Sequence, residues 1–137
     1  MTDEQTRVNV AAEVARGTDA LESARILLAA GKFADAVSRA YYGAYHYARA
    51  LLLTCGEEPR THGGLDRLLQ REFVRTKKLD PMDARLLSRL MTFRQNADYT
   101  AEYVFTDATA REEVEAAHTF TAAATAILTG EGWVGER

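Results

Sequence analysis

The stretch FADAVSRAYYGAYHYARALLLTC, residues 33–55, decides the fold class of this sequence. Its apolar side chains recur at the alternating spacing of four and three residues that places them on one face of an α-helix. The members of this stripe are Tyr41, Tyr45, Ala48 and Leu52. Gly56 follows the stretch, and Pro59 lies in the next loop. We therefore expect a helix over residues 33–55 that buries this stripe and ends at the glycine.

The same periodicity predicts four further helices, over about residues 3–30, 61–77, 81–101 and 107–128. Thr61 is suited to cap the third helix, and Asp80 followed by Pro81 is a strong start for the fourth. Thr106 or Asp107 can cap the fifth. No segment alternates in the manner of a strand, and the loops are short. The sequence thus predicts an all-α, up-and-down helical bundle.

Composition fits one domain spanning residues 1–137, with 47% hydrophobic and 27% charged residues. In the fourth helix we expect a core stripe at spacings of four, four, three and four. Its members are Met82, Leu86, Leu90, Phe93 and Ala97. Residues 130–137 are expected to form a flexible tail.

A cytoplasmic location is expected, without a membrane partner. No apolar run approaches the roughly 20 residues of a membrane span, and the N-terminus is acidic where a signal peptide would be basic. The single cysteine, Cys55, cannot close a bridge within the chain.

Charge is distributed unevenly. Residues 60–94 contain nine basic and four acidic side chains, a local charge of +5, although the whole chain carries −3. Arg67, Arg71 and Arg75 form a row at a spacing of four within this block. The block indicates either a local anionic partner or a solvated basic helix face.

Arg39, Tyr42, His46 and Arg49 share a second face of the 33–55 helix. Two guanidinium groups, a phenol and an imidazole on one face are suited to a phosphate-bearing ligand. The alternative is a cluster of hydrogen bonds and cation–π contacts that orders the bundle.

A further candidate lies near the end of the fourth helix, in RQNADY, residues 94–99. Arg94 shares an apolar flank with Leu87 and Met91, so its charge needs a partner. Asp98, one turn later, is the local candidate, and a phosphate is the functional one.

Other chemistries are not expected. The sequence contains neither of the glycine-rich motifs that bind nucleotide phosphates, G-x-x-x-x-G-K-[ST] and G-x-G-x-x-G. The three histidines, His46, His62 and His118, lack metal-ligand spacing with one another or with Cys55. We therefore expect no metal and no cofactor.

Three separated segments resemble the prokaryotic HEPN domain of the small stand-alone type: SRAYYGAYHYARALL (38–52), THGGL (61–65) with EFV (72–74), and RQNADY (94–99). The resemblance covers about residues 14–129. It implies four main helices plus a shorter one, and a homodimer whose second and fourth helices line one cleft. It also implies a minimal nucleotidyltransferase as partner, the two forming a toxin–antitoxin pair.

HEPN ribonucleases carry an arginine, a polar residue, three variable positions and a histidine. Arg94 and Gln95 match the first two positions, but Tyr99 stands at that of the histidine. An ordinary phenol, with a pKa near 10, is a poor base at pH 7. Some of these toxins also carry a tyrosine two residues later that the partner modifies; this chain has Ala101 there, and Tyr103 lies two positions further on.

Three functions follow as hypotheses. The first is a nucleotide- or RNA-binding component of the toxin–antitoxin type, with weak or no RNase activity. The second is a metal-independent ribonuclease in which Arg94 acts together with His46 or Tyr99. The third is a structural helical dimer without a ligand. The candidate binding residues are Arg39, Tyr42, His46, Arg49, Arg94, Gln95, Asp98 and Tyr99.

Overall fold

The computed structural model describes residues 3–135. The helices are α1 (Asp3–Ala29), α2 (Phe33–Leu53), α3 (His62–Leu69), α4 (Pro81–Tyr99) and α5 (Asp107–Gly130). A wider, π-helical turn, η1 (Gln70–Val74), continues α3. Within residues 3–135 no strand occurs, so the all-α class expected from the sequence is confirmed.

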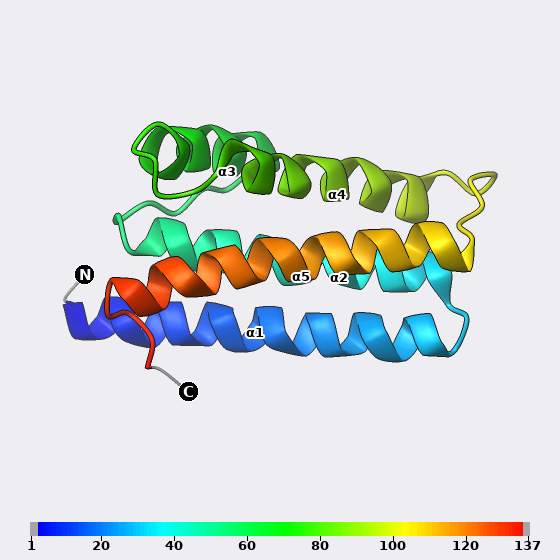
Figure 1. Ribbon diagram of the computed structural model, residues 1–137, viewed down its shortest axis with the longest axis horizontal. Helices are drawn as coiled ribbons and strands as arrows, with labels where there is room; N and C mark the ends of the chain where they lie inside the picture. The colour runs from blue at the N-terminus through cyan, green and yellow to red at the C-terminus, as the bar shows by residue number, and fades with distance from the viewer. Residues whose placement is uncertain (1–2, 136–137) are drawn as a thin grey trace.

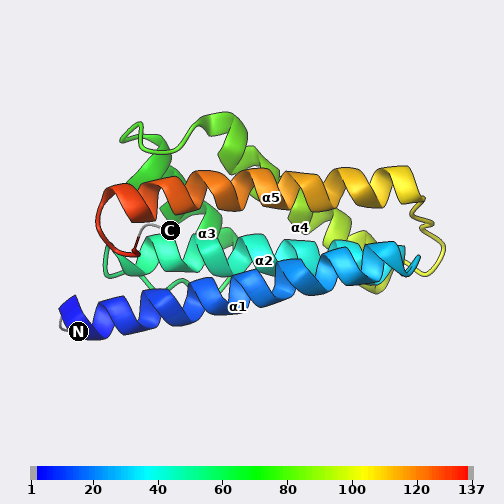
Figure 2. The ribbon, with the colours of Figure 1, turned by 60° about the horizontal axis from the view of Figure 1, so that its bottom comes forward.

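The four long helices form an up-and-down bundle (Figure 1). α1 and α4 run in one direction, whereas α2 and α5 run in the other. α1 and α4 lie on opposite sides of the central pair formed by α2 and α5, an arrangement also visible after rotation (Figure 2). The short α3 and η1 sit at the end of the bundle where α4 begins. One face of α2 is therefore bordered by α1 and by α4.

The expected helix starts are confirmed by their hydrogen bonds. The side chain of Thr61 accepts from the backbone N–H of Gly64, and that of Asp80 accepts from the N–H of Met82. At the start of α5, Thr106 and Thr109 cap each other's backbone N–H groups. Each cap satisfies a donor that the first helical turn leaves free.

The third helix departs from the expected continuous α-helix over 61–77. Leu65, Leu69 and Phe73 are all fully buried, yet a spacing of four drifts around an α-helix by about 40° each time. The π-helical turn of η1 has more residues per turn, so it compensates for this rotation and keeps Phe73 in the core. The segment then ends at Lys77, which has a φ of 63°, and Lys78 donates its N–H back to Phe73 O.

The expected core stripe of the fourth helix was partly wrong. Met82 is 70% exposed, whereas Ala84 and Leu87, outside that stripe, are fully buried together with Leu90. The reason is that α4 packs on both α2 and α5 and so buries a wider arc than one stripe. Met82 lies in the first turn, at the end of the bundle.

α1 and α2 approach each other closely at two glycines. A Cβ on Gly17 would lie 2.6 Å from the Tyr47 ring and 3.0 Å from the backbone oxygen of Gly43. A Cβ on Gly43 would lie 2.7 Å from the Leu21 side chain. These two positions therefore set the distance between the helices.

Part of the expected tail is attached to the bundle. Trp133 packs against the core, its backbone N–H donates to Leu128 O, and the guanidinium of Arg7 lies 5.1 Å from its ring centre. Residues 136 and 137 lie outside the described part. Among the described helices, none has the length and apolar character needed to cross a membrane.

Candidate functional site

Arg94 is the centre of an aromatic cluster between α2 and α4. Its guanidinium carbon lies 5.5 Å from the ring centre of Tyr41, 5.4 Å from that of Tyr42 and 5.5 Å from that of Tyr99. Asp98, one turn further along α4, completes what we call the Arg94 cluster. Its members are Tyr41, Tyr42, Arg94, Asp98 and Tyr99. The side chain of Arg94 is only 14% exposed.

The hydrogen bonds of Arg94 leave part of its donor capacity weakly used. Nη2 donates to the phenol oxygens of Tyr42, at 3.0 Å, and Tyr99, at 3.3 Å. Nη1 donates to the thioether sulfur of Met91, a weak acceptor. Nε lies 3.1 Å from Asp98 Oδ2, but this buried N–H makes no directed hydrogen bond. The guanidinium therefore retains donors that a phosphate oxygen would satisfy better.

Asp98 is itself anchored across the bundle, because the hydroxyl of the nearly buried Ser38 donates to its Oδ2 at 3.4 Å. Burial acts to lower the pKa of Arg94, but the neighbouring Tyr42, Tyr99 and Asp98 raise it overall. The guanidinium thus stays charged. It is close to one carboxylate, that of Asp98, and to three tyrosine rings.

Tyr99 covers the cluster from outside. Its side chain is 73% exposed although its hydroxyl accepts from Arg94. The ring contacts Arg94, and most of the residue faces solvent, so a ligand that displaces it reaches the Nη2 edge. Tyr42 is half-buried beneath it, and the guanidinium of Arg39 lies 4.8 Å from the Tyr42 ring centre. A base could stack on these rings while a phosphate meets Arg94.

His46 and Arg49 belong to a different cluster. His46 Nδ1 lies 2.7 Å from Glu13 Oε2, and Arg49 donates to Glu13 Oε1 at 3.3 Å and to the backbone oxygen of Pro59 at 2.8 Å. Burial acts to raise the pKa of Glu13, but the hydrogen bonds from both partners outweigh it, and the pKa is lowered. This Glu13 cluster joins α1 to α2.

The expected binding face of α2 is thus divided between its two neighbours. Tyr42 and Arg39 turn toward the Arg94 cluster on the α4 side, whereas His46 and Arg49 are held by α1. Gln95 and Arg39 are exposed. Arg94, Asp98, Tyr99 and Tyr42, named separately from the sequence, are brought into contact.

Sequence reasoning assigned no site role to Tyr41, Ser38, Glu13 or His62. Tyr41 carried only a packing signal, and it is indeed 3% exposed. The signal for His62 was its place in the THGGL segment, beside two glycines. The signal for Ser38 was its place at the start of the SRAYYGAYHYARALL segment, whereas Glu13 gave no signal in sequence, because its partners lie on another helix.

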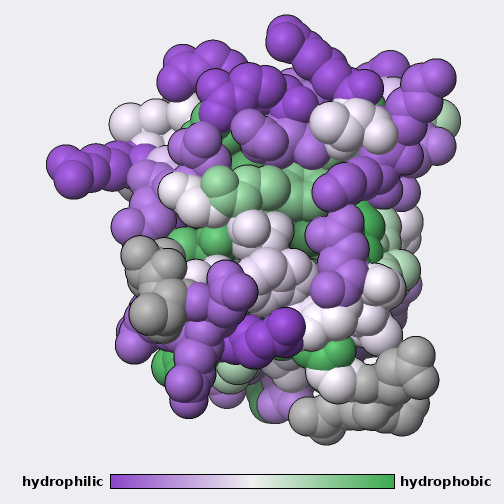
Figure 3. Space-filling model, turned by 90° about the vertical axis from the view of Figure 1, so that its left-hand side faces the viewer, coloured by the Kyte–Doolittle hydropathy of each residue, from purple (hydrophilic) through white to green (hydrophobic). Residues whose placement is uncertain are grey.

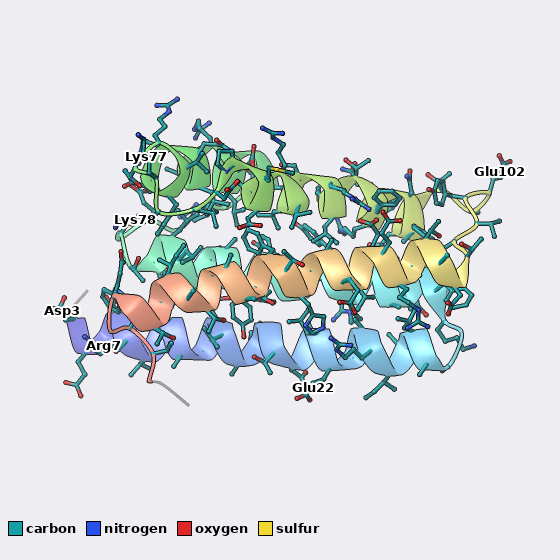
Figure 4. The ribbon with its side chains drawn as sticks, viewed as in Figure 1. Asp3, Arg7, Glu22, Lys77, Lys78 and Glu102 are labelled. Atoms are coloured by element: carbon teal, nitrogen blue, oxygen red, sulfur yellow. The ribbon has the colours of Figure 1, made fainter. Side chains whose placement is uncertain are left out.

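The basic row on α3 and η1 is exposed, and its central member is paired. Arg71 donates to Glu57 Oε1 at 2.9 Å and to Glu72 Oε1 at 3.0 Å. The end view of the bundle shows hydrophilic side chains crowded over the region of α3 and η1 (Figure 3). Lys77 and Lys78 lie at this end, whereas Glu102, just beyond α4, lies at the opposite end (Figure 4).

A groove of about 1360 Å³ runs between α1 and α5, with Tyr47 and Trp133 among its lining residues. No member of the Arg94 cluster lines it. We assign the candidate site to the Arg94 cluster in spite of this groove. A sheltered charge with unused hydrogen-bond donors is stronger evidence for a binding site than the volume of a groove.

Comparison with protein families shows the family of the chain. The family model described as the HEPN domain matches residues 12–127. The chain belongs to the HEPN family. The match contains both α2 and α4, and hence every member of the Arg94 cluster.

Curated proteins similar to this chain come from archaea and bacteria. A protein of Methanocaldococcus jannaschii named "Putative toxin MJ0605" is 31% identical over 115 residues, which cover 84% of this chain and 82% of that protein. A second M. jannaschii protein, "Putative toxin MJ0142", is 32% identical over 88 residues, 64% of this chain and 60% of its own length. A Thermotoga maritima protein named "UPF0332 protein" is 29% identical over 105 residues, 77% of this chain and 80% of its own.

Proposed function

We propose that this HEPN protein is the nucleotide- or RNA-binding component of a toxin–antitoxin-type pair, with Arg94 as the phosphate anchor and with weak or no RNase activity. The observation that carries the proposal is the geometry of Arg94. A charged guanidinium sits among three tyrosine rings with an undirected Nε–H and with Nη1 facing only a thioether.

A phosphate in this position would compete with Asp98 for the guanidinium. The phosphate offers several acceptor oxygens, and the planar fork of donors on the guanidinium can meet two of them at once. The exchange requires Tyr99 to move, and its exposure makes that motion inexpensive. Tyr42 and Tyr99 then offer stacking surfaces, so a nucleotide is favoured over inorganic phosphate.

The pairing with a minimal nucleotidyltransferase is supported by family membership and by the word toxin in the names of two relatives. The adjacent gene tests it. A short nucleotidyltransferase encoded next to this gene, and co-purification of the two proteins, are the expected results.

We also propose a homodimer whose interface includes the C-terminal end of α4 and the loop that follows it. Tyr103 and Val104, just beyond α4, are 39% and 80% exposed, so they leave apolar surface uncovered at this end of the bundle. Light scattering should give about twice the chain mass. A mass near 15.2 kDa at every concentration would contradict the dimer.

Weak or absent RNase activity is proposed because the group beside Arg94 is the phenol of Tyr99. A proton acceptor for a ribose hydroxyl works best when it titrates near the working pH, and a phenol ordinarily does not. The site can then hold RNA without cleaving it.

Two arginine variants test the binding site directly. Arg94→Ala should weaken the binding of a fluorescein-labelled oligouridylate by about 1–3 kcal/mol, the range for charge-assisted contacts. Arg111→Ala is the matched control, because Arg111 is exposed and paired with Asp107 within α5. Fluorescence anisotropy measures both affinities.

Arg94→Lys protects this test against a folding defect. It keeps the charge but loses the forked donors, so its affinity should lie between wild type and Arg94→Ala. Equal affinities for wild type, Arg94→Ala and Arg111→Ala would remove Arg94 from the site.

A further inference from the structure

His62 and Arg94 meet at the same side chain. The hydroxyl of Tyr41 lies 3.0 Å from His62 Nδ1, and the two ring centres are 5.8 Å apart. The guanidinium carbon of Arg94 lies 5.5 Å from the ring centre of Tyr41. An imidazole from the start of α3 therefore stands one side chain away from the proposed phosphate anchor on α4.

The hydrogen bond to Tyr41 fixes the form of this imidazole. Burial raises the pKa of Tyr41, so its phenol stays protonated. A buried hydroxyl needs an acceptor, and His62 Nδ1 provides it, which places the ring proton of neutral His62 on Nε2. Within residues 3–135, Nε2 has no hydrogen-bond partner, and the ring is only half-buried.

Burial and two charged groups set the charge of His62. Burial lowers its pKa, the carboxylate of Asp66 on α3 acts in the opposite direction, and the positive charge of Arg94 on α4 lowers it again. Tyr41, from α2, is neutral. Asp66 is partly occupied by the hydroxyl of Ser88, which donates to it at 3.2 Å. The net result is a neutral imidazole beside a cation.

We propose that His62 is a second ligand contact of the Arg94 site, and that it takes up a proton from solvent when an RNA phosphate binds. The inference rests on the proposed function and adds a specificity-determining residue to it. A nucleic-acid strand that reaches from Arg94 to the half-buried ring of His62 brings negative charge to both groups. An anion offsets the repulsion from Arg94 and favours the protonated imidazole.

Proton uptake gives the affinity a defined dependence on pH. The imidazole of the free protein protonates only below the ordinary pKa of about 6.5, and bound phosphate moves that pKa upward. Between the two values the complex holds more protons than the free protein, so affinity rises as the pH falls. For one proton the change is at most about tenfold per pH unit.

The experiment measures the binding of a labelled oligouridylate between about pH 8 and about pH 5.5, on either side of the ordinary histidine pKa. The label is tetramethylrhodamine, whose fluorescence does not titrate in this range. Uridine itself does not titrate in this range. Wild-type affinity should rise at least about threefold toward the acidic end. His62→Asn, whose side-chain oxygen can still accept from Tyr41, should abolish this rise.

His118→Asn is the matched control. His118 lies on α5, and burial lowers its pKa as well, but its charged neighbours are Arg25 and Glu115. This variant should keep the full wild-type dependence. Wild-type binding that depends on Arg94 but not on pH, or an unchanged pH dependence in His62→Asn, overturns the role of His62 and leaves the proposed function standing. An oligouridylate that fails to bind wild type at any pH overturns both.

A titration of the wild-type protein keeps the proposal testable if His62→Asn does not fold. The imidazole carbon-bound protons of His62 report its pKa by NMR, with and without the oligouridylate. The pKa should rise on binding. An unchanged or lowered value contradicts proton uptake at His62.

Discussion

Tyr99 occupies the position at which HEPN ribonucleases carry their histidine. Its contacts shield the guanidinium of Arg94 and do not resemble those of a general base. Its hydroxyl accepts from Arg94 Nη2 at 3.3 Å, and its ring lies on the guanidinium. It therefore uses the same edge of Arg94 that a scissile phosphate would need. Substitution of Tyr99 can therefore change RNA cleavage while Arg94 still binds the RNA phosphate.

Tyr99→His should create or raise RNA cleavage in the presence of a chelator. The substitution places a group that titrates near neutrality beside the phosphate anchor, and it removes the phenol that occupies Arg94. Wild type should cleave little or not at all. Gel analysis of a labelled single-stranded RNA, with the protein alone, measures the change.

The double variant Tyr99→His with Arg94→Ala is the control, and it should lose the gained cleavage because anchor and base act together. Vigorous cleavage by wild type would instead place the base elsewhere. His62 and His46 are then the residues to substitute first. Wild-type cleavage that survives loss of both histidines and of Arg94 would exclude the Arg94 cluster as the catalytic centre.

Residues that share a helix face could be grouped from the sequence, but their partners could not. The spacing of Arg39, Tyr42, His46 and Arg49 placed them correctly on one face of α2. Which neighbour each side chain meets depends on how α1 and α4 pack beside that face. Glu13, on α1, holds His46 and Arg49, and no periodicity within α2 contains that information.

At the scale of elements, the crossing of α1 and α2 depends on two residues without side chains. Gly17 is buried in the middle of α1, where a glycine on its own would weaken the helix. Its benefit is the close approach to Tyr47 and to the backbone of Gly43. The crossing in turn positions the face of α2 that carries Tyr42.

Gly17→Ala should destabilise the protein by about 1–3 kcal/mol, the cost of overpacking a tight contact. The added Cβ would lie 3.0 Å from the Gly43 carbonyl oxygen, which is backbone and cannot rotate away. Urea unfolding followed by circular dichroism measures the free energy of unfolding.

Gly63→Ala is the matched control in α3. A Cβ there meets no atom within 4 Å, so the better helix propensity of alanine should leave stability unchanged or raise it by up to about 1 kcal/mol. If Gly17→Ala proved as stable as wild type, the two helices would not be limited by this contact.

Helix existence and helix starts were predictable because caps and periodicity are local signals. Asp80 with Pro81 is an example, and the structure confirms it. The wide turn η1 and the buried arc of α4 were not predictable in the same way. Both arise because an element must satisfy two neighbours at once, and the second neighbour is distant in sequence.

At the scale of the whole molecule, the bundle separates an exposed basic row from the sheltered guanidinium of Arg94. The basic row consists of Arg67 on α3, Arg71 on η1 and Arg75 directly after η1, whereas the Arg94 cluster lies toward the other end of α4. The row is exposed, and Arg71 is already paired with two carboxylates. Charge counting along the sequence singled out the row, whereas the apolar flank of Arg94 indicated a sheltered charge. The packing of α2 against α4 adds the tyrosine rings that surround this charge.

Photo-crosslinking of an oligouridylate that contains 4-thiouridine, followed by mass spectrometry, tests most directly whether RNA binds at the Arg94 cluster. The crosslinked peptides should be those that contain Tyr42 and Tyr99, whose rings are accessible beside Arg94, and Arg94→Ala should abolish these crosslinks. Crosslinks confined to the segment of Arg67, Arg71 and Arg75, and unaffected by Arg94→Ala, would contradict the site.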